Sequence, residues 1–186
     1  MEQVKKEKNE VWEWAKALLI AFIAAWLIRY FLFTPIVVDG ESMMPTLENG
    51  ERMIVNKIGY EVEGPNRYDI VVFHATEKQD YIKRVIGLPG DHVAYKNDQL
   101  FINGEPQEEP YLESNKNEVS SGTLTEDFTL EELTGEKVIP DGYLFVMGDN
   151  RSNSTDSRII GLVPMKEVIG STSVAFWPLN EIGRVQ

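Results

Sequence analysis

Apolar and polar positions divide the chain into one long apolar segment near its start and many short apolar runs after it. The long segment covers residues 17–33 and is interrupted only by Arg29, close to its end. At ~1.5 Å per residue a helix of this length covers roughly 25 Å, and flanking turns can extend it to the roughly 30 Å of a bilayer core. The pattern therefore predicts one transmembrane helix at residues 15–33.

A cleaved signal peptide is the alternative interpretation of this segment. Cleavage would need small residues directly after the apolar core. The sequence continues instead into Phe31-Leu32-Phe33-Thr34-Pro35, where no small residue is correctly placed. We therefore favour an anchor that stays attached to the protein.

Basic residues predict how the anchor is oriented. Four lysines precede the apolar segment, and the next basic residue after Arg29 is Arg52. An excess of Lys and Arg marks the cytoplasmic side of a membrane segment. We expect a single-pass protein of the cell membrane, with residues 1–14 in the cytoplasm and residues 34–186 outside. The lysines are Lys5, Lys6, Lys8 and Lys16.

Beyond residue 34 the pattern is that of short strands rich in Val, Ile, Phe and Tyr. Turn residues separate these runs, and Asn97-Asp98 between two of them is typical of a hairpin turn. One short helix is indicated at residues 130–133, where Thr129 and Glu132 form a capping-box pattern and Gly135 can end the turn. These features predict a mainly β domain. The expected strands are residues 52–55, 69–73, 81–86, 93–95, 99–102, 143–147 and 173–176.

Composition and charge narrow the function classes. The chain has 186 residues and a net charge of −12, with no Cys and two His. Residues 105–141 hold eleven acidic residues and two lysines, which indicates an acidic, partly mobile insertion on the β framework. An acidic chain without a basic stripe is a poor nucleic-acid binder. The lack of Cys and the scarcity of His exclude disulfides and Cys- or His-rich metal sites.

The candidate chemistry is that of a serine hydroxyl with a lysine base. Ser42 begins the run Ser42-Met43-Met44-Pro45-Thr46, nine residues after the apolar segment. Serine is a weak nucleophile until a base takes its proton, and lysine can be that base if burial lowers its pKa. Period-2 alternation places Lys83 on one strand face with Tyr81 and Val85. Lys57 competes for the role on pattern alone.

A dense polar run, residues 148–158, follows an expected strand directly. Its simplest interpretation is a solvated turn with local side-chain hydrogen bonds. A calcium loop is excluded because Arg151, Ser154 and Ile160 occupy positions where such a loop needs other residues. The run is therefore a third candidate part of a site.

Together these blocks resemble the type I signal peptidases, in the small form with a single anchor that is typical of Gram-positive bacteria. The resemblance covers nearly the whole chain and implies a signal-peptidase-like fold. It also implies a membrane-bound serine endopeptidase that removes signal peptides from exported preproteins at the outer membrane face, without metal or cofactor. Besides the apolar segment, it rests on residues 40–47, residues 50–57, residues 68–73 with 81–91, and residues 148–158.

The resemblance also assigns roles to individual residues. It implies that Ser42 is the nucleophile and selects Lys83 over Lys57 as the base. Ser154 matches a hydroxyl that orients the lysine, and Asp156 and Arg158 match residues that brace the site. Asp149 is expected to pair with Arg84. Many Gram-negative members carry a serine where this chain has Gly40, so the oxyanion hole would rely on the Ser42 N–H and on other donors.

Signal peptides end in an Ala-x-Ala-like stretch, which a strand-rich site can bind as an additional β-strand. By similarity the walls of the first side-chain pocket are Val38, Met43, Leu47 and Ile82, for which plain core packing is the alternative.

Two other functions remain open. A membrane-tethered, self-cleaving Ser/Lys peptidase is disfavoured because no DNA-binding domain precedes the dyad, and a non-enzymatic surface-binding β-domain would not need the dyad.

Overall fold

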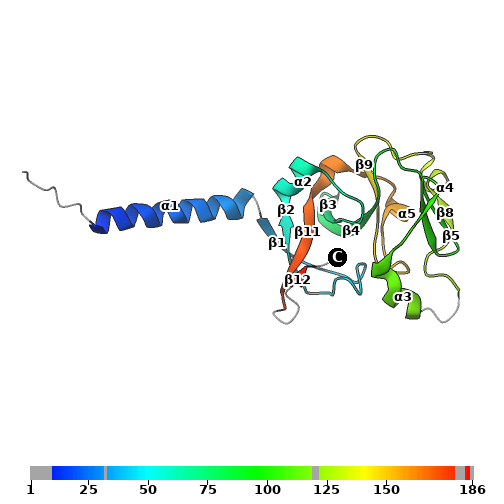
Figure 1. The fold of residues 1–186 in the computed structure, drawn as a ribbon, viewed down its shortest axis with the longest axis horizontal. Helices are drawn as coiled ribbons and strands as arrows, with labels where there is room; N and C mark the ends of the chain where they lie inside the picture. The colour runs from blue at the N-terminus through cyan, green and yellow to red at the C-terminus, as the bar shows by residue number, and fades with distance from the viewer. Residues whose placement is uncertain (1–9, 32, 119–121, 179–182, 185–186) are drawn as a thin grey trace, which may run out of the picture.

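The computed structural model describes residues 10–31, 33–118, 122–178 and 183–184. Helix α1 (Glu10–Phe31) extends away from a β-rich body, as Figure 1 shows. Among the residues that the structure describes, no helix combines the length and apolar character that crossing a membrane requires. Residue 32 and the side chains of residues 27–33, which belong to the expected span at residues 15–33, lie outside the described parts of the structure. The expected cytoplasmic lysines Lys5, Lys6 and Lys8 lie outside them too.

Two antiparallel sheets form the body. Within the described ranges the larger sheet has eight strands, seven of them in the order β1-β2-β11-β3-β4-β9-β10, with β12 paired to β11. The smaller sheet has the order β7-β6-β5-β8. The strands of the larger sheet are β1 (Phe33–Val37), β2 (Arg52–Asn56), β3 (Ile70–Thr76), β4 (Gln79–Gly87), β9 (Tyr143–Met147), β10 (Val163–Pro164), β11 (Val168–Trp177) and β12 (Gly183–Arg184).

The small sheet lies at the side of the body farther from α1 (Figure 1). Two of its strands belong to the acidic stretch at residues 105–141, which is therefore built into this sheet. Its strands are β5 (Val93–Lys96), β6 (Gln99–Ile102), β7 (Glu105–Gln107) and β8 (Phe128–Thr129). The short helices of the body are α2 (Lys57–Glu63), η1 (Pro110–Leu112), α3 (Glu113–Glu118), α4 (Leu130–Thr134), α5 (Ser157–Ile160) and η2 (Met165–Glu167).

The mainly β prediction is confirmed, and each expected strand overlaps an observed one. Strands β3, β4 and β11 are longer than expected: β3 continues to Thr76, β4 begins at Gln79 and β11 begins at Val168. The hairpin turn at Asn97-Asp98 is confirmed too, since both residues have positive φ between β5 and β6, as tight hairpin turns require. Helix α4 has the expected capping box of Thr129 and Glu132 and ends at Gly135 in the left-handed region.

The sequence pattern missed two kinds of element. Strand β1 was missed because it starts at Phe33, inside the expected anchor. A helix is disfavoured there because Pro35 restricts the residue before it. The other missed elements are α2, α3, α5, η1, η2 and several strands of two or three residues, and these are too short to show a period.

Strand β4 lies at the centre of the body. Val85 packs in one apolar cluster with residues of β3 and β9. Ile86 points the other way, into the cluster that joins the two sheets. Because successive strand residues alternate between faces, both faces of β4 are covered in this half. The strand is thereby fixed by packing on both sides, and it positions the neighbouring Lys83.

Candidate active site

The loop between β1 and β2 holds Ser42. Two backbone bonds close the loop, from Val38 N to Glu51 O at 2.8 Å and from Gly50 N to Val38 O at 2.9 Å. Met43 is 1 % exposed and packs in an apolar cluster with Val38 and Met53. The residue after Ser42 thus anchors the loop in the core while the serine faces the cleft.

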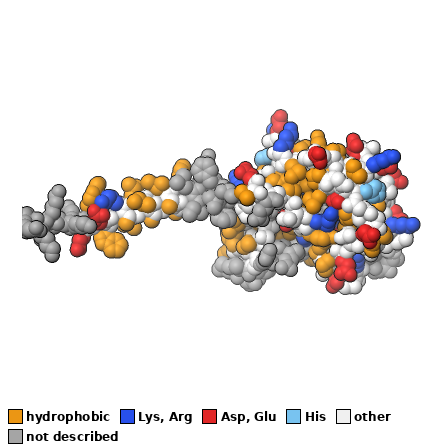
Figure 2. Space-filling view, turned by 45° about the horizontal axis from the view of Figure 1, so that its top comes forward, with side chains coloured by type: hydrophobic (Ala, Val, Ile, Leu, Met, Phe, Trp, Pro, Cys, Tyr) orange, Lys and Arg blue, Asp and Glu red, His pale blue; other side chains and the backbone are white. Residues whose placement is uncertain are grey.

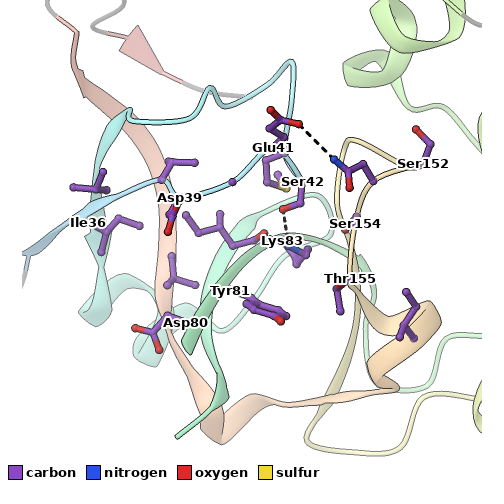
Figure 3. Close-up of a pocket in the computed structure, with 18 residues that line it drawn as sticks. Ile36, Asp39, Glu41, Ser42, Asp80, Tyr81, Lys83, Ser152, Ser154 and Thr155 are labelled. Carbon is purple, nitrogen blue, oxygen red and sulfur yellow. Dashed lines mark hydrogen bonds between the residues drawn. The ribbon is translucent and has the colours of Figure 1, made fainter. Parts of the chain in front are cut away.

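Ser42 and Lys83 contact each other directly. Lys83 Nζ donates a hydrogen bond to Ser42 Oγ at 2.7 Å, which Figure 3 shows as a dashed line. It also donates to the carbonyl oxygen of Ile82 at 2.9 Å and lies 5.1 Å from the ring centroid of Tyr81. Lys57, the other candidate base, begins helix α2 and is not among the residues that line the cleft.

Burial sets the protonation behaviour of Lys83, whose side chain is only 4 % exposed. Desolvation disfavours the ammonium form and lowers the pKa of Lys83 to about 8, although the nearby Asp156 and Asp149 oppose this shift. The amine is therefore neutral in a useful fraction of molecules near neutral pH. A neutral amine next to a hydroxyl can accept its proton.

The polar loop after β9 packs tightly against Ser42. Asn150 N donates to the carbonyl oxygen of Ser42 at 3.0 Å, and Asn150 Nδ2 donates to that of Glu41 at 3.1 Å. A Cβ on Gly148 would lie 2.4 Å from the Ser42 carbonyl oxygen and 2.3 Å from Ser154 Oγ. Only glycine lets the two segments approach this closely.

Asp156 organises the base of the polar loop. It accepts hydrogen bonds from Gly148 N at 3.0 Å and from Arg158 Nη2 at 2.8 Å, and it caps helix α5. Burial alone would raise the pKa of Asp156, but the hydrogen bonds and charge of Arg158 and the N–H of Gly148 outweigh burial and hold that pKa below its usual value. Asp156 is therefore a fixed negative charge close to Lys83.

Ser154 lies next to Gly148, and its hydroxyl is buried. This hydroxyl also favours ionised Asp156, yet it makes no hydrogen bond of good geometry within the described residues. Its expected role in orienting Lys83 therefore stays a prediction.

Arg84 follows Lys83 and points to the opposite face of β4. It forms two hydrogen bonds with Asp149, Nε to Oδ1 at 2.9 Å and Nη2 to Oδ2 at 2.6 Å. The two side chains are 2 % and 0 % exposed. This buried, bidentate pair joins the strand that holds the lysine to the loop that contacts the serine.

A cleft of about 730 Å³ opens beside the dyad. Its walls come from the end of β1 and the segment after it, from the first half of β4 and from the polar loop, which face one another in Figure 3. Val38, Met43 and Ile82 line it, as expected for a first pocket, and they also belong to the apolar cluster beneath. Leu47 is fully buried in that cluster and is not among the lining residues.

Comparison with known proteins identifies the family of this fold and site. Residues 11–177 match the family described as "Signal peptidase, peptidase S26". The chain belongs to this signal peptidase family. It is 46 % identical over 181 residues to signal peptidase I of Bacillus caldolyticus, covering 97 % of both chains. It is 43 % identical over 178 residues to signal peptidase IB of Staphylococcus aureus (strain COL), covering 94 % of this chain and 93 % of the relative.

A solved structure is similar as well. The crystal structure of a signal peptidase I from Enterococcus faecalis V583 is 45 % identical, with a TM-score of 0.55, and the match covers 57 % of this chain and 95 % of that one. The predicted resemblance to type I signal peptidases is confirmed. As a member of the signal peptidase family, the protein is a serine endopeptidase.

Sequence reasoning missed a second buried ion pair. Arg151 Nη2 lies 2.5 Å from Glu109 Oε1, and the side chains are 0 % and 1 % exposed. The Tyr95 hydroxyl hydrogen-bonds to both partners, and the Tyr111 hydroxyl donates to Glu109 at 2.7 Å. Arg151 stands in a run of polar residues that resembles a solvated turn, so the sequence carries no signal of its burial.

Proposed function

We propose that the protein removes signal peptides from exported preproteins, with Ser42 as the nucleophile and Lys83 as a neutral general base. The observation that carries this proposal is the 2.7 Å hydrogen bond between Lys83 Nζ and Ser42 Oγ beside an open cleft. A self-cleaving peptidase or a non-enzymatic binding domain is favoured by no comparable observation in the described parts of the chain.

In the first half of the reaction, Lys83 takes the proton of Ser42 Oγ as the oxygen attacks the carbonyl carbon of the scissile bond. Within the described residues the Ser42 N–H donates no hydrogen bond, so it is available to the negative charge that develops on the substrate oxygen. The lysine ammonium then gives its proton to the departing amine. An acyl-enzyme remains on Ser42 Oγ.

In the second half, water replaces the amine. Lys83, neutral again, takes a proton from the water as it attacks the acyl carbon, and the proton passes to Ser42 Oγ as the ester bond breaks. The signal peptide leaves with a free carboxylate. A single amine on a fixed strand thus serves both halves of the reaction.

The cleft suits an extended peptide. Strand β9 pairs with β4 only between Arg84 and Gly87, so the first half of β4 has one free backbone edge. Strand β1 pairs only with β2 in the described part of the sheet, and residues 36–39 line the opposite wall of the cleft. A peptide that enters can bind as an additional strand. Val38, Met43 and Ile82 would then limit the first side-chain pocket to small residues, with Leu47 as support behind them.

The proposed membrane attachment rests on α1. Large apolar side chains on all sides of this helix are exposed, with Trp14 at 70 %, Phe22 at 72 % and Trp26 at 55 %, and Figure 2 shows them in orange along the helix. Such a surface is unfavourable in water and needs an apolar partner. We propose that residues 15–33 anchor the protein in the bilayer, with the N-terminus in the cytoplasm and the peptidase body outside.

The test uses the full chain in detergent with a labelled preprotein. We expect a single cleavage after a small residue, identified by sequencing the new N-terminus. Ser42→Ala should fold yet lose several orders of magnitude in rate. Cleavage by Ser42→Ala within tenfold of the wild-type rate would remove Ser42 from the mechanism. Protease added to intact protoplasts should digest the body, and full protection before lysis would show the opposite orientation.

A further inference from the structure

The first part of the acidic stretch packs against the loops that build the site. Glu109 pairs with Arg151 of the polar loop at 2.5 Å. The ring of Tyr111 lies over the guanidinium of Arg84, with the centroid 4.0 Å from Cζ. Helix α3 follows directly after η1, and its Asn115 turns back toward the nucleophile. The stretch thus contacts both buried ion pairs beside the dyad.

Asn115 connects two backbone segments that lie far apart in the sequence, the Ser42 loop and the polar loop after β9. Its Nδ2 donates to the carbonyl oxygen of Asp149 at 3.0 Å and to that of Met44 at 3.3 Å. Met44 lies two residues after Ser42, and Asp149 lies directly before Asn150, whose N–H binds the Ser42 carbonyl. One side-chain amide therefore closes a ring of contacts around the nucleophile.

We propose that Asn115 is a positioning residue of the active site, which fixes the Ser42 loop against the polar loop so that Ser42 Oγ stays within reach of Lys83. The proposal rests on the proposed function of the dyad. Both acceptors of the Asn115 amide are carbonyl oxygens, so the position needs a side chain with N–H donors, and the amide group supplies two. A displacement of about 1 Å at a reacting group can cost about a hundredfold in rate.

The same helix offers a matched control. Asn117 is exposed, and its side chain makes no hydrogen bond with the described residues. Replacing Asn115 or Asn117 by Ala changes helix propensity to a similar extent, while only the first change removes the contacts to Met44 and Asp149. Neither residue lines the cleft, so substrate binding should be unaffected by both.

The experiment compares Asn115→Ala, Asn115→Asp, Asn117→Ala and Asn117→Asp in the detergent-solubilised full chain. It measures kcat and KM for a labelled preprotein, the rate at which a serine-reactive acylating inhibitor modifies Ser42, and the thermal unfolding midpoint. In both Asn115 variants we expect kcat and the acylation rate to fall about tenfold or more, with KM within twofold of wild type. Asn115→Asp should fall further, because a carboxylate repels both carbonyl oxygens. The Asn117 variants should stay within twofold of wild type.

Wild-type kcat and acylation rate in the Asn115 variants would overturn the proposal, as would equal losses in the Asn117 variants. A rise in KM with an unchanged acylation rate would instead assign Asn115 to substrate binding and would also overturn it. If Asn115→Ala fails to fold, the isosteric Asn115→Asp decides. Failure of the wild-type protein to cleave the preprotein would contradict the proposed function, while the acylation rates would still test Asn115.

Discussion

Lys83 Nζ lies 2.7 Å from Ser42 Oγ although 41 positions separate the two residues along the chain. The contact depends on two different kinds of support. Lys83 belongs to a strand that is packed on both faces, whereas Ser42 belongs to a loop held by backbone hydrogen bonds and by the buried side chain of Met43. Substitutions in strand β4 and substitutions in the Ser42 loop should therefore affect activity in different ways.

The protonation of Lys83 predicts a dependence of rate on pH. The ammonium form cannot accept the Ser42 proton, and burial lowers the pKa of Lys83 to about 8. We expect kcat/KM to rise with pH and to level off above a pH of about 8. Lys83→Arg should lose as much activity as Lys83→Ala, because a guanidinium stays protonated. Lys57→Ala is the control and should keep the wild-type profile.

The kcat/KM of preprotein cleavage, measured across pH for wild type and the three variants, would check this prediction. Substantial activity in Lys83→Arg, or the same alkaline limb in Lys83→Ala, would transfer the role of base to another group.

Burial of the Lys83 amine should also lower the stability of the folded protein. A lysine whose folded-state pKa lies below its unfolded value opposes folding at pH below about 8, and this cost fades as pH rises toward its ordinary value of 10.5. Lys83→Met removes the amine and keeps an unbranched apolar chain. We expect the variant to unfold at a higher temperature than wild type at pH 7, with a difference that shrinks by pH 10. Thermal unfolding of both proteins at the two pH values measures it, and a constant difference would contradict the argument.

Gly148→Ala should impair the site through crowding. The added methyl group meets a backbone atom, the Ser42 carbonyl oxygen, as well as Ser154 Oγ. We expect a loss of more than tenfold in kcat and a destabilisation of about 1–3 kcal/mol, measured by cleavage assays and urea unfolding. Adding Ser154→Ala removes only one of the two obstacles, so the double variant should recover little activity. Full recovery would mean that the backbone contact with Ser42 is unimportant.

Asp149→Ala should destabilise the protein strongly, because it leaves the guanidinium of Arg84 buried without its carboxylate partner. Breaking a buried ion pair in this way costs about 3–5 kcal/mol. Glu167→Ala is the comparison, since it breaks the exposed pair with Lys166, for which about 0–1 kcal/mol is expected. Urea unfolding would measure both changes, and similar losses would show that the Arg84 pair contributes little.

The strands of the fold were largely predictable from sequence. Strands β2, β3 and β4 carry dense runs of Val, Ile and Phe between turn residues, which is a local signal. Strand β1 gave no separate signal, because its residues continue the apolar segment before it. Two-residue strands such as β10 depend on their partner in the sheet, which the local sequence does not contain.

The site was predictable only in part. Spacing alone left Lys57 and Lys83 as equal candidates for the base, and the resemblance selected Lys83. The structure places Lys83 beside Ser42 because β4 passes under the loop, a long-range arrangement that no local pattern encodes. Arg151 and Asn115 could not be predicted, since a polar residue in a polar run looks solvent-exposed until the chain folds over it.

Strand β1 separates helix α1 from the cleft. Helix α1 ends at Phe31 and β1 begins at Phe33, and all five residues of β1 pair with β2. At ~3.3 Å per residue, this strand spans at most about 17 Å, and the cleft starts along it. With α1 in a bilayer, the length of β1 limits the height of the cleft above the lipid surface, so the depth at which a preprotein is held decides which of its peptide bonds arrives at Ser42.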